Sequence, residues 1–78
     1  MADVLESIKG AILDRIPGAA VVVEAGSSGH FVIDVVSPVF AGKSMVESQR
    51  LVYGAIAHLM KGDGAPVHAV DRLTTRAP

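Results

Sequence analysis

The stretch AAVVVEAGSSGHFVIDVVS, residues 19–37, decides the fold of this chain. Small and β-branched residues run from Ala19 to Glu24, and a second run of the same kind extends from His30 to Ser37. A turn rich in glycine and serine, residues 25–29, separates the two runs. Adjacent β-rich runs joined by such a turn are typical of an antiparallel hairpin.

Side chains alternate between the two faces of a strand, so the second run also predicts which face is buried. Phe31, Ile33 and Val35 share the more apolar face, which we expect to point into the core. His30 then stands at the start of the strand, on the less buried side and next to the turn.

An amphipathic helix is predicted before the hairpin, because apolar residues recur at spacings of three and four over residues 4–16. Asp3 is its expected cap, and Pro17 and Gly18 end it. Beyond the hairpin, Ser44 and Glu47 have the spacing of a capping box at a helix start.

The second helix is expected over residues 45–61. Gly54 inside it costs about 1 kcal/mol relative to alanine, and close packing on the sheet would be a reason to keep it. Its predicted apolar face consists of Val46, Val52, Ala55, Ile56, Leu59 and Met60. A third strand from Val67 to about Thr74 follows a flexible segment. The order of elements is therefore αββαβ, which indicates an α+β fold.

Bulk composition limits the classes of function. A chain of 78 residues with a net charge of -1 predicts one domain, residues 1–78, and no strong attraction to DNA. It contains no cysteine, so it can form neither a disulfide nor a thiolate metal site by itself. No signal peptide and no apolar run of about 20 residues is visible, which leads us to expect a soluble cytoplasmic protein with no membrane partner.

Catalytic motifs are absent from the sequence. The serines lack a histidine and aspartate at a recognisable spacing, so we predict that the chain is not an enzyme. Gly42, Lys43 and Ser44 resemble the end of a phosphate-binding loop, but the upstream glycine would have to be residue 37, which is Ser37. A turn followed by a capped helix explains the same residues.

Three histidines remain as candidates for a functional role. His58 lies in the middle of the second helix, where we interpret it as a residue without a ligand role. His30 and His68 begin the second and third strands, so the two imidazoles can lie at one end of the sheet if these strands are neighbours. Two histidines supply half of a four-coordinate metal site, and the other ligands would have to come from a partner.

Three spaced motifs resemble the BolA family. They are Ser37 to Ser44, which fits S-x-x-F-x-G-x-S, the helix segment Gln49 to Tyr53, and the strand Val67 to Val70, which fits I-H-A-L/V. The segment Gly29 to Phe31 is also similar to the G-S-x-S-H-F motif with which the family's second strand begins. The helix segment looks closer to the short-loop bacterial branch called IbaG. The resemblance implies a fold like the type II KH module, with helices covering one face of a three-stranded sheet.

The resemblance also implies a function. Members of the family pair with monothiol glutaredoxins and hold a [2Fe-2S] cluster between a glutaredoxin cysteine, a glutathione thiolate and histidines, in iron-sulfur trafficking and iron homeostasis. His68 matches the invariant histidine of the third strand. The second ligand falls near Ser27 in the first turn, and His30 is the preferred substitute because serine is a poor iron ligand. No cluster is expected in the isolated chain.

Two alternatives stay open. The KH-like topology suggests a nucleic-acid-binding transcriptional regulator that uses Lys43, Arg50 and Lys61, although residues 47–50 lack the R-H-R stretch of many relatives. A metal-free interaction domain would instead use a sheet edge or the loop around Phe40 and Gly42.

Overall fold

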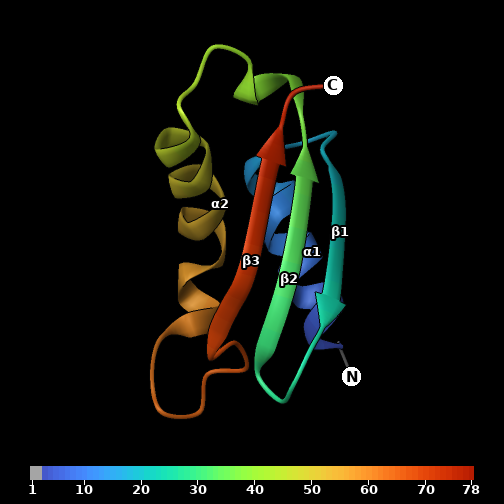
Figure 1. The fold of residues 1–78 in the computed structure, drawn as a ribbon. Coiled ribbons are helices and arrows are strands. Elements are labelled where there is room, and N and C mark those ends of the chain that lie inside the picture. The colour runs from blue at the N-terminus through green and yellow to red at the C-terminus, as the bar shows by residue number, and fades with distance from the viewer. Residues whose placement is uncertain (1–2) are drawn as a thin grey trace.

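The computed structural model describes residues 3–78 and contains two α-helices, three strands and one short 3-10 helix. In chain order these are α1 (Val4–Arg15), β1 (Ala20–Ala25), β2 (His30–Val36), η1 (Pro38–Phe40), α2 (Met45–Met60) and β3 (Ala69–Arg76). Figure 1 shows the strands side by side, with α1 behind them and α2 alongside β3. The αββαβ order expected from the sequence is confirmed.

The sheet is mixed, with the strand order β1-β2-β3. β1 and β2 pair antiparallel through the turn at residues 26–29, which confirms the predicted hairpin. β2 and β3 are parallel neighbours, because η1 and α2 carry the chain back to the end where β2 begins. Central β2 is therefore bonded on both sides, and it presents its first residue at the same end as the first residue of β3.

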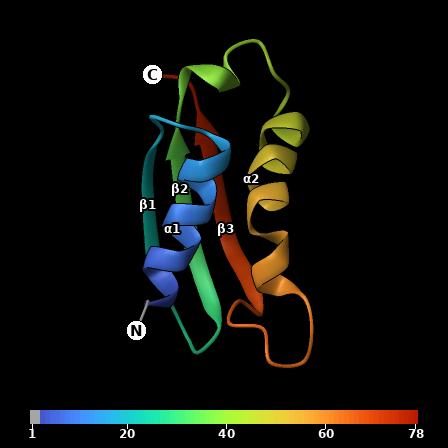
Figure 2. The same ribbon diagram turned by 180° about the vertical axis from the view of Figure 1, so that it is seen from behind.

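Both helices cover one face of the sheet, as seen from behind in Figure 2. Phe31, Ile33 and Val35 of β2 are at most 5% exposed, so the predicted core face is correct. Their largest fully buried partners in the core are Ile8, Ile12, Val52, Ile56 and Val67. β3 contributes Val70 and Leu73, which are only partly buried. Within residues 3–78, no helix packs on the opposite face of the sheet.

The start of α2 is capped as predicted. The Ser44 side chain accepts a hydrogen bond from the Glu47 N–H at 3.1 Å, and the Glu47 carboxylate accepts one from the Ser44 N–H at 3.2 Å. The predicted apolar face of α2 is wrong at Val46, which is 56% exposed. Ser48 is buried instead, because residues two apart on a helix point in different directions.

β3 begins two residues later than predicted, at Ala69, and extends to Arg76. Val67 does not join the ladder, because its N–H donates to the Leu59 carbonyl at the end of α2. At the far end, the Ser37 N–H donates to the Arg76 carbonyl at 3.0 Å and lengthens the strand. Within residues 3–78, no helix is long and apolar enough to cross a membrane.

Candidate functional site

Two loops and two strand starts meet at one end of the sheet, the lower end in Figure 1. His30, the first residue of β2, pairs in register with Ala69, the first residue of β3. His68 therefore lies in the segment directly before β3, one residue outside the strand in which it was predicted. The expected meeting of the His30 and His68 segments at one end of neighbouring strands is what the register shows.

His68 is held against the turn between β1 and β2. Its N–H donates to the Gly29 carbonyl at 2.8 Å, and the Ala69 N–H donates to the same oxygen at 3.1 Å. Gly29 has a φ of 76°, and a Cβ on it would lie 2.7 Å from both Cγ and Nδ1 of His68. The imidazole therefore rests directly on a glycine, and only glycine leaves room for it in this conformation.

His30 has a different partner. Its Nδ1 lies 2.9 Å from Oδ1 of Asp71, and the two side chains are 40% and 51% exposed. Asp71 was not among the residues that sequence reasoning selected. Its position relative to His30 depends on the register of β3 and on an irregularity between Phe31 and Val32, which no local pattern reveals.

The turn residue Ser27, the alternative to His30 as second ligand, contributes its backbone to the same region. Its carbonyl accepts a hydrogen bond from the His30 N–H at 2.9 Å, and its residue surface is exposed. Over residues 3–78, no group of three or more His, Cys, Asp or Glu side chains is arranged to hold a metal ion.

Basic side chains gather elsewhere, at the start of α2. Lys43 and Arg50 border a shallow depression together with Arg15 from the end of α1, and Glu47 and Leu51 complete its lining. Lys61 caps the other end of the 16-residue helix, about 24 Å away at 1.5 Å per residue. Of the three residues predicted to bind nucleic acid, the structure thus brings Lys43 and Arg50 together and places Lys61 apart from them. Arg15, which was not predicted, joins the first two.

Glu47 reduces the positive charge of that depression. The Ser44 N–H donates to the Glu47 carboxylate and, with the Ser44 hydroxyl and nearby Lys43, holds the pKa of Glu47 below its ordinary value of 4.5. The carboxylate is therefore ionised at neutral pH, and the depression carries three cations and one anion.

Phe40, which was predicted with Gly42 to contact a partner, has its side chain inside the core. It ends η1 and is only 5% exposed, so its ring belongs to the core and anchors the loop before α2. Gly42 follows with a φ of 77°, which allows the chain to turn toward α2. Any contact of this loop with a partner would use its exposed neighbours, such as Val39 and Met45, which are 42% and 73% exposed.

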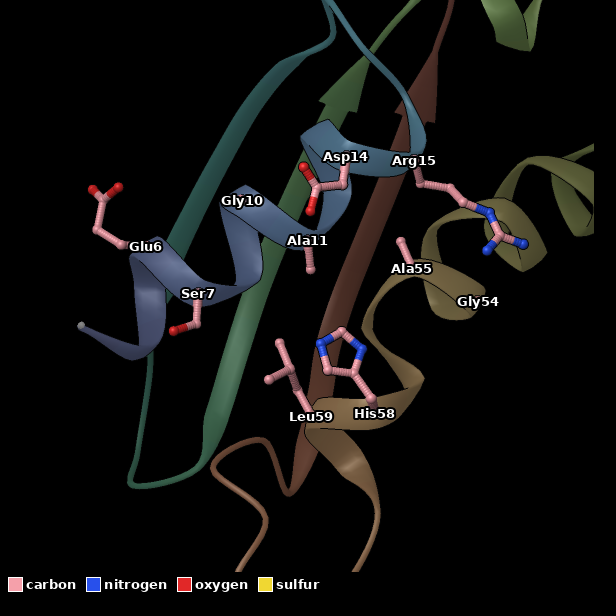
Figure 3. A pocket seen from close by; sticks show the side chains of 10 residues that line it. All are labelled: Glu6, Ser7, Gly10, Ala11, Asp14, Arg15, Gly54, Ala55, His58 and Leu59. Carbon is pink, nitrogen blue, oxygen red and sulfur yellow. The ribbon is translucent and has the colours of Figure 1, made fainter. Parts of the chain in front are cut away.

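His58 lies away from the other histidines, in a groove between α1 and α2 that Figure 3 shows from close by. Arg15 of α1 reaches toward α2 there, and a Cβ on Gly54 would lie 3.6 Å from its Nη2 atom. Gly54 is exposed, so close packing on the sheet is not the reason for this glycine. It leaves space for an arginine of the neighbouring helix instead.

Comparisons with known proteins agree with one another. A family described as BolA-like protein matches residues 7–78. A BolA protein homologue from Coxiella burnetii is 31% identical, with a TM-score of 0.76 and coverage of 100% of this chain and 94% of that one. Mouse BolA1 is 26% identical, with a TM-score of 0.76 and coverage of 100% and 68%.

BolA1 from Arabidopsis thaliana has a TM-score of 0.81, with coverage of 100% of this chain and 95% of that one. At 21% identity, this last likeness shows the fold alone. A comparison with curated protein sequences found no match.

Proposed function

The chain belongs to the BolA-like family, and we propose that it is a non-enzymatic partner of a monothiol glutaredoxin, with which it shares a [2Fe-2S] cluster. The cluster would be cargo in iron-sulfur trafficking and iron homeostasis. The observation that carries the proposal is the placement of His68 and His30 at adjoining strand starts, at one exposed end of the sheet.

The chemistry of the two side chains fits this role. Imidazole is an established ligand of iron in [2Fe-2S] centres, where it replaces thiolate and raises the reduction potential. The chain contains no cysteine, so histidine is the ligand type it can offer in the place that cysteine usually takes in [2Fe-2S] centres. A glutaredoxin cysteine and a glutathione thiolate would supply the remaining ligands, as membership of the family suggests.

Accessibility also supports the proposal. His68 is exposed, and the side chain of His30 is 40% exposed. The Nδ1 atom of His30 is engaged by Asp71, which leaves Nε2 without a described contact inside residues 3–78. When bound, the cluster would supply electron-transfer capacity and a transferable iron centre, while this chain would supply and orient the nitrogen ligands.

The test is to co-express the chain with a monothiol glutaredoxin and purify the complex anaerobically with glutathione. Visible absorption and circular dichroism are then recorded for wild type, His68→Ala and His58→Ala. His58 is the matched control, since it is also exposed but lies in the groove between the helices.

The expected result is a [2Fe-2S] spectrum in wild type and His58→Ala that is changed or lost in His68→Ala while the complex still forms. A wild-type chain that yields neither complex nor chromophore would contradict the proposal.

A second candidate function is nucleic-acid binding, which the cations of Arg15, Lys43 and Arg50 around one depression favour. The Glu47 carboxylate in the same depression and the distance of Lys61 make this candidate weaker. Backbone binding by several cations would give an affinity that falls steeply with salt. A fluorescence titration with single-stranded RNA and duplex DNA at two salt concentrations would reveal it, with Lys43→Gln/Arg50→Gln as the variant that should lose it.

A further inference from the structure

We propose that Asp71 is a positioning residue that fixes the tautomer and orientation of His30. We further propose that His30, rather than Ser27, is the ligand that this chain supplies to the shared cluster in addition to His68. The inference rests on the proposed function for the identity of what His30 binds. Its structural part, the control of His30 by Asp71, stands on the geometry at the start of β2 and β3.

The contact between the two side chains determines which ring nitrogen carries the proton. An ionised carboxylate accepts hydrogen bonds and donates none, so the ring must donate through Nδ1 across the 2.9 Å separation. A neutral imidazole has one donor and one acceptor nitrogen. Neutral His30 is therefore expected as the Nδ1–H tautomer, with the lone pair on Nε2.

A β-bulge creates this contact. Phe31 pairs with Val70, but Val32 pairs with Arg72, so Asp71 is the extra residue of β3. A bulge redirects the side chain of the inserted residue and leaves it outside the regular ladder. Asp71 lies two residues beyond Ala69, which is the register partner of His30. This is a diagonal position, from which the Asp71 side chain can reach His30 on the neighbouring strand.

The carboxylate is also close to the turn that carries Ser27. A Cβ on Gly26 would lie 3.8 Å from Oδ2 of Asp71 and 3.7 Å from the carbonyl oxygen of His30. The Gly26 N–H donates to that same carbonyl at 2.9 Å. Asp71 therefore lies over the junction between the turn and β2, and it holds the His30 ring from the side of the sheet that the helices do not cover.

Ion pairing alone does not explain this arrangement. Both side chains are about half exposed, and exposed pairs contribute about 0–1 kcal/mol to stability. Orientation is the larger effect, because histidines that bind metals donate their other ring N–H to a carboxylate or carbonyl, which fixes the tautomer and raises ligand basicity. His30 has such a carboxylate in Asp71. The hydrogen bond that Ser27 makes to the His30 N–H uses the Ser27 backbone carbonyl and not its side chain.

The first experiment needs no cluster. The free chain is labelled with 15N-histidine, and long-range proton–nitrogen correlation spectra are recorded at a pH alkaline enough for imidazoles to be neutral. Wild type is compared with Asp71→Ala and Asp71→Asn. Asp63→Asn, an exposed acid in the loop after α2, is the control for the change in charge.

The expected result is a His30 ring in the Nδ1–H tautomer in wild type and in Asp63→Asn. In Asp71→Ala the population should shift toward Nε2–H, which a solvated imidazole prefers, while the spectrum of His58 stays the same. A His30 ring that is already Nε2–H in wild type, or that is unchanged in Asp71→Ala, would overturn the proposal.

The second experiment uses the complex with glutaredoxin and glutathione. Loss of a carboxylate behind a histidine ligand lowers metal affinity by about 10- to 100-fold, so Asp71→Ala should release its cluster to a chelator faster than wild type by a factor in that range. His30→Ala should be at least as fast, and Ser27→Ala should match wild type.

Equal release by wild type, His30→Ala and Asp71→Ala would overturn the ligand role of His30, even with the expected tautomer. The family role itself is judged separately, from the His68→Ala complex. Failure of the proposal about Asp71 is thus distinguishable from failure of the proposed function.

Discussion

Replacing Gly29 with alanine would test how the fold holds His68. The backbone at Gly29 has a φ of 76°, and an L-residue in the left-handed region costs about 1–2 kcal/mol. The new Cβ would also lie 2.7 Å from two ring atoms of His68 and 3.1 Å from its Cβ. These separations are too short, so the imidazole has to move.

The size of the second effect follows from exposure. His68 is exposed, so its ring can rotate away, but the approach to its Cβ also requires a small shift of the loop. We therefore expect an additional cost near the low end of the about 1–3 kcal/mol found for overpacking. The total destabilisation should be about 2–3 kcal/mol.

Gly18→Ala provides the matched control. Gly18 has a φ of 81°, and a Cβ there would meet nothing within 4 Å, so this variant carries the backbone cost without the collision. Urea denaturation of the free chain measures both costs, and histidine NMR spectra report the environment of His68. Gly29→Ala should be the less stable variant, and it alone should shift the His68 signals.

A Gly29→Ala variant as stable as Gly18→Ala, with unchanged His68 signals, would refute the reasoning. It would mean that the imidazole does not rest on the glycine. The test involves no partner and no cluster, so its outcome does not depend on the proposed function.

Three further predictions concern the helix start and the core. Ser44→Ala should cost about 1 kcal/mol in urea denaturation, because it removes the side-chain half of the capping box. Glu47→Gln should keep that box but alter the acid limb of a stability–pH profile. The folded-state pKa of Glu47 is lowered from 4.5, so its ionised form stabilises the fold above that pH and the effect is lost as pH falls through the folded-state pKa. Ile33→Ala should cost about 2–5 kcal/mol, since Ile33 is 0% exposed, whereas Val22→Ala at 53% exposure should cost about 0.5 kcal/mol or less.

The order of elements was predictable because the local signals agree with one another. Alternation in residues 30–36, the capping box at Ser44 and the Asp3 cap each predict the element that the structure contains. The boundary of β3 was not predictable, since Val67 has a strand-forming side chain but its N–H bonds to the end of α2. Only the tertiary arrangement decides between those two uses of the same backbone group.

The candidate site was predictable only in part. His30 and His68 could be placed at one end because each stands at the edge of a β-rich run. Asp71 could not be selected, because its approach to His30 depends on a bulge and on a parallel pairing between segments 41 residues apart. Arg15 was missed for a similar reason, since the packing of α1 on α2 brings it beside Lys43 and Arg50.

The central claim is that His68 provides a nitrogen ligand to the shared cluster. The most direct measurement is pulsed electron paramagnetic resonance on the reduced complex, with 15N-histidine in this chain and unlabelled glutaredoxin and glutathione. The account predicts a 15N coupling to the cluster in wild type that is lost or altered in His68→Ala and kept in His58→Ala. A cluster that shows no 15N coupling, or the same coupling in all three proteins, would contradict it.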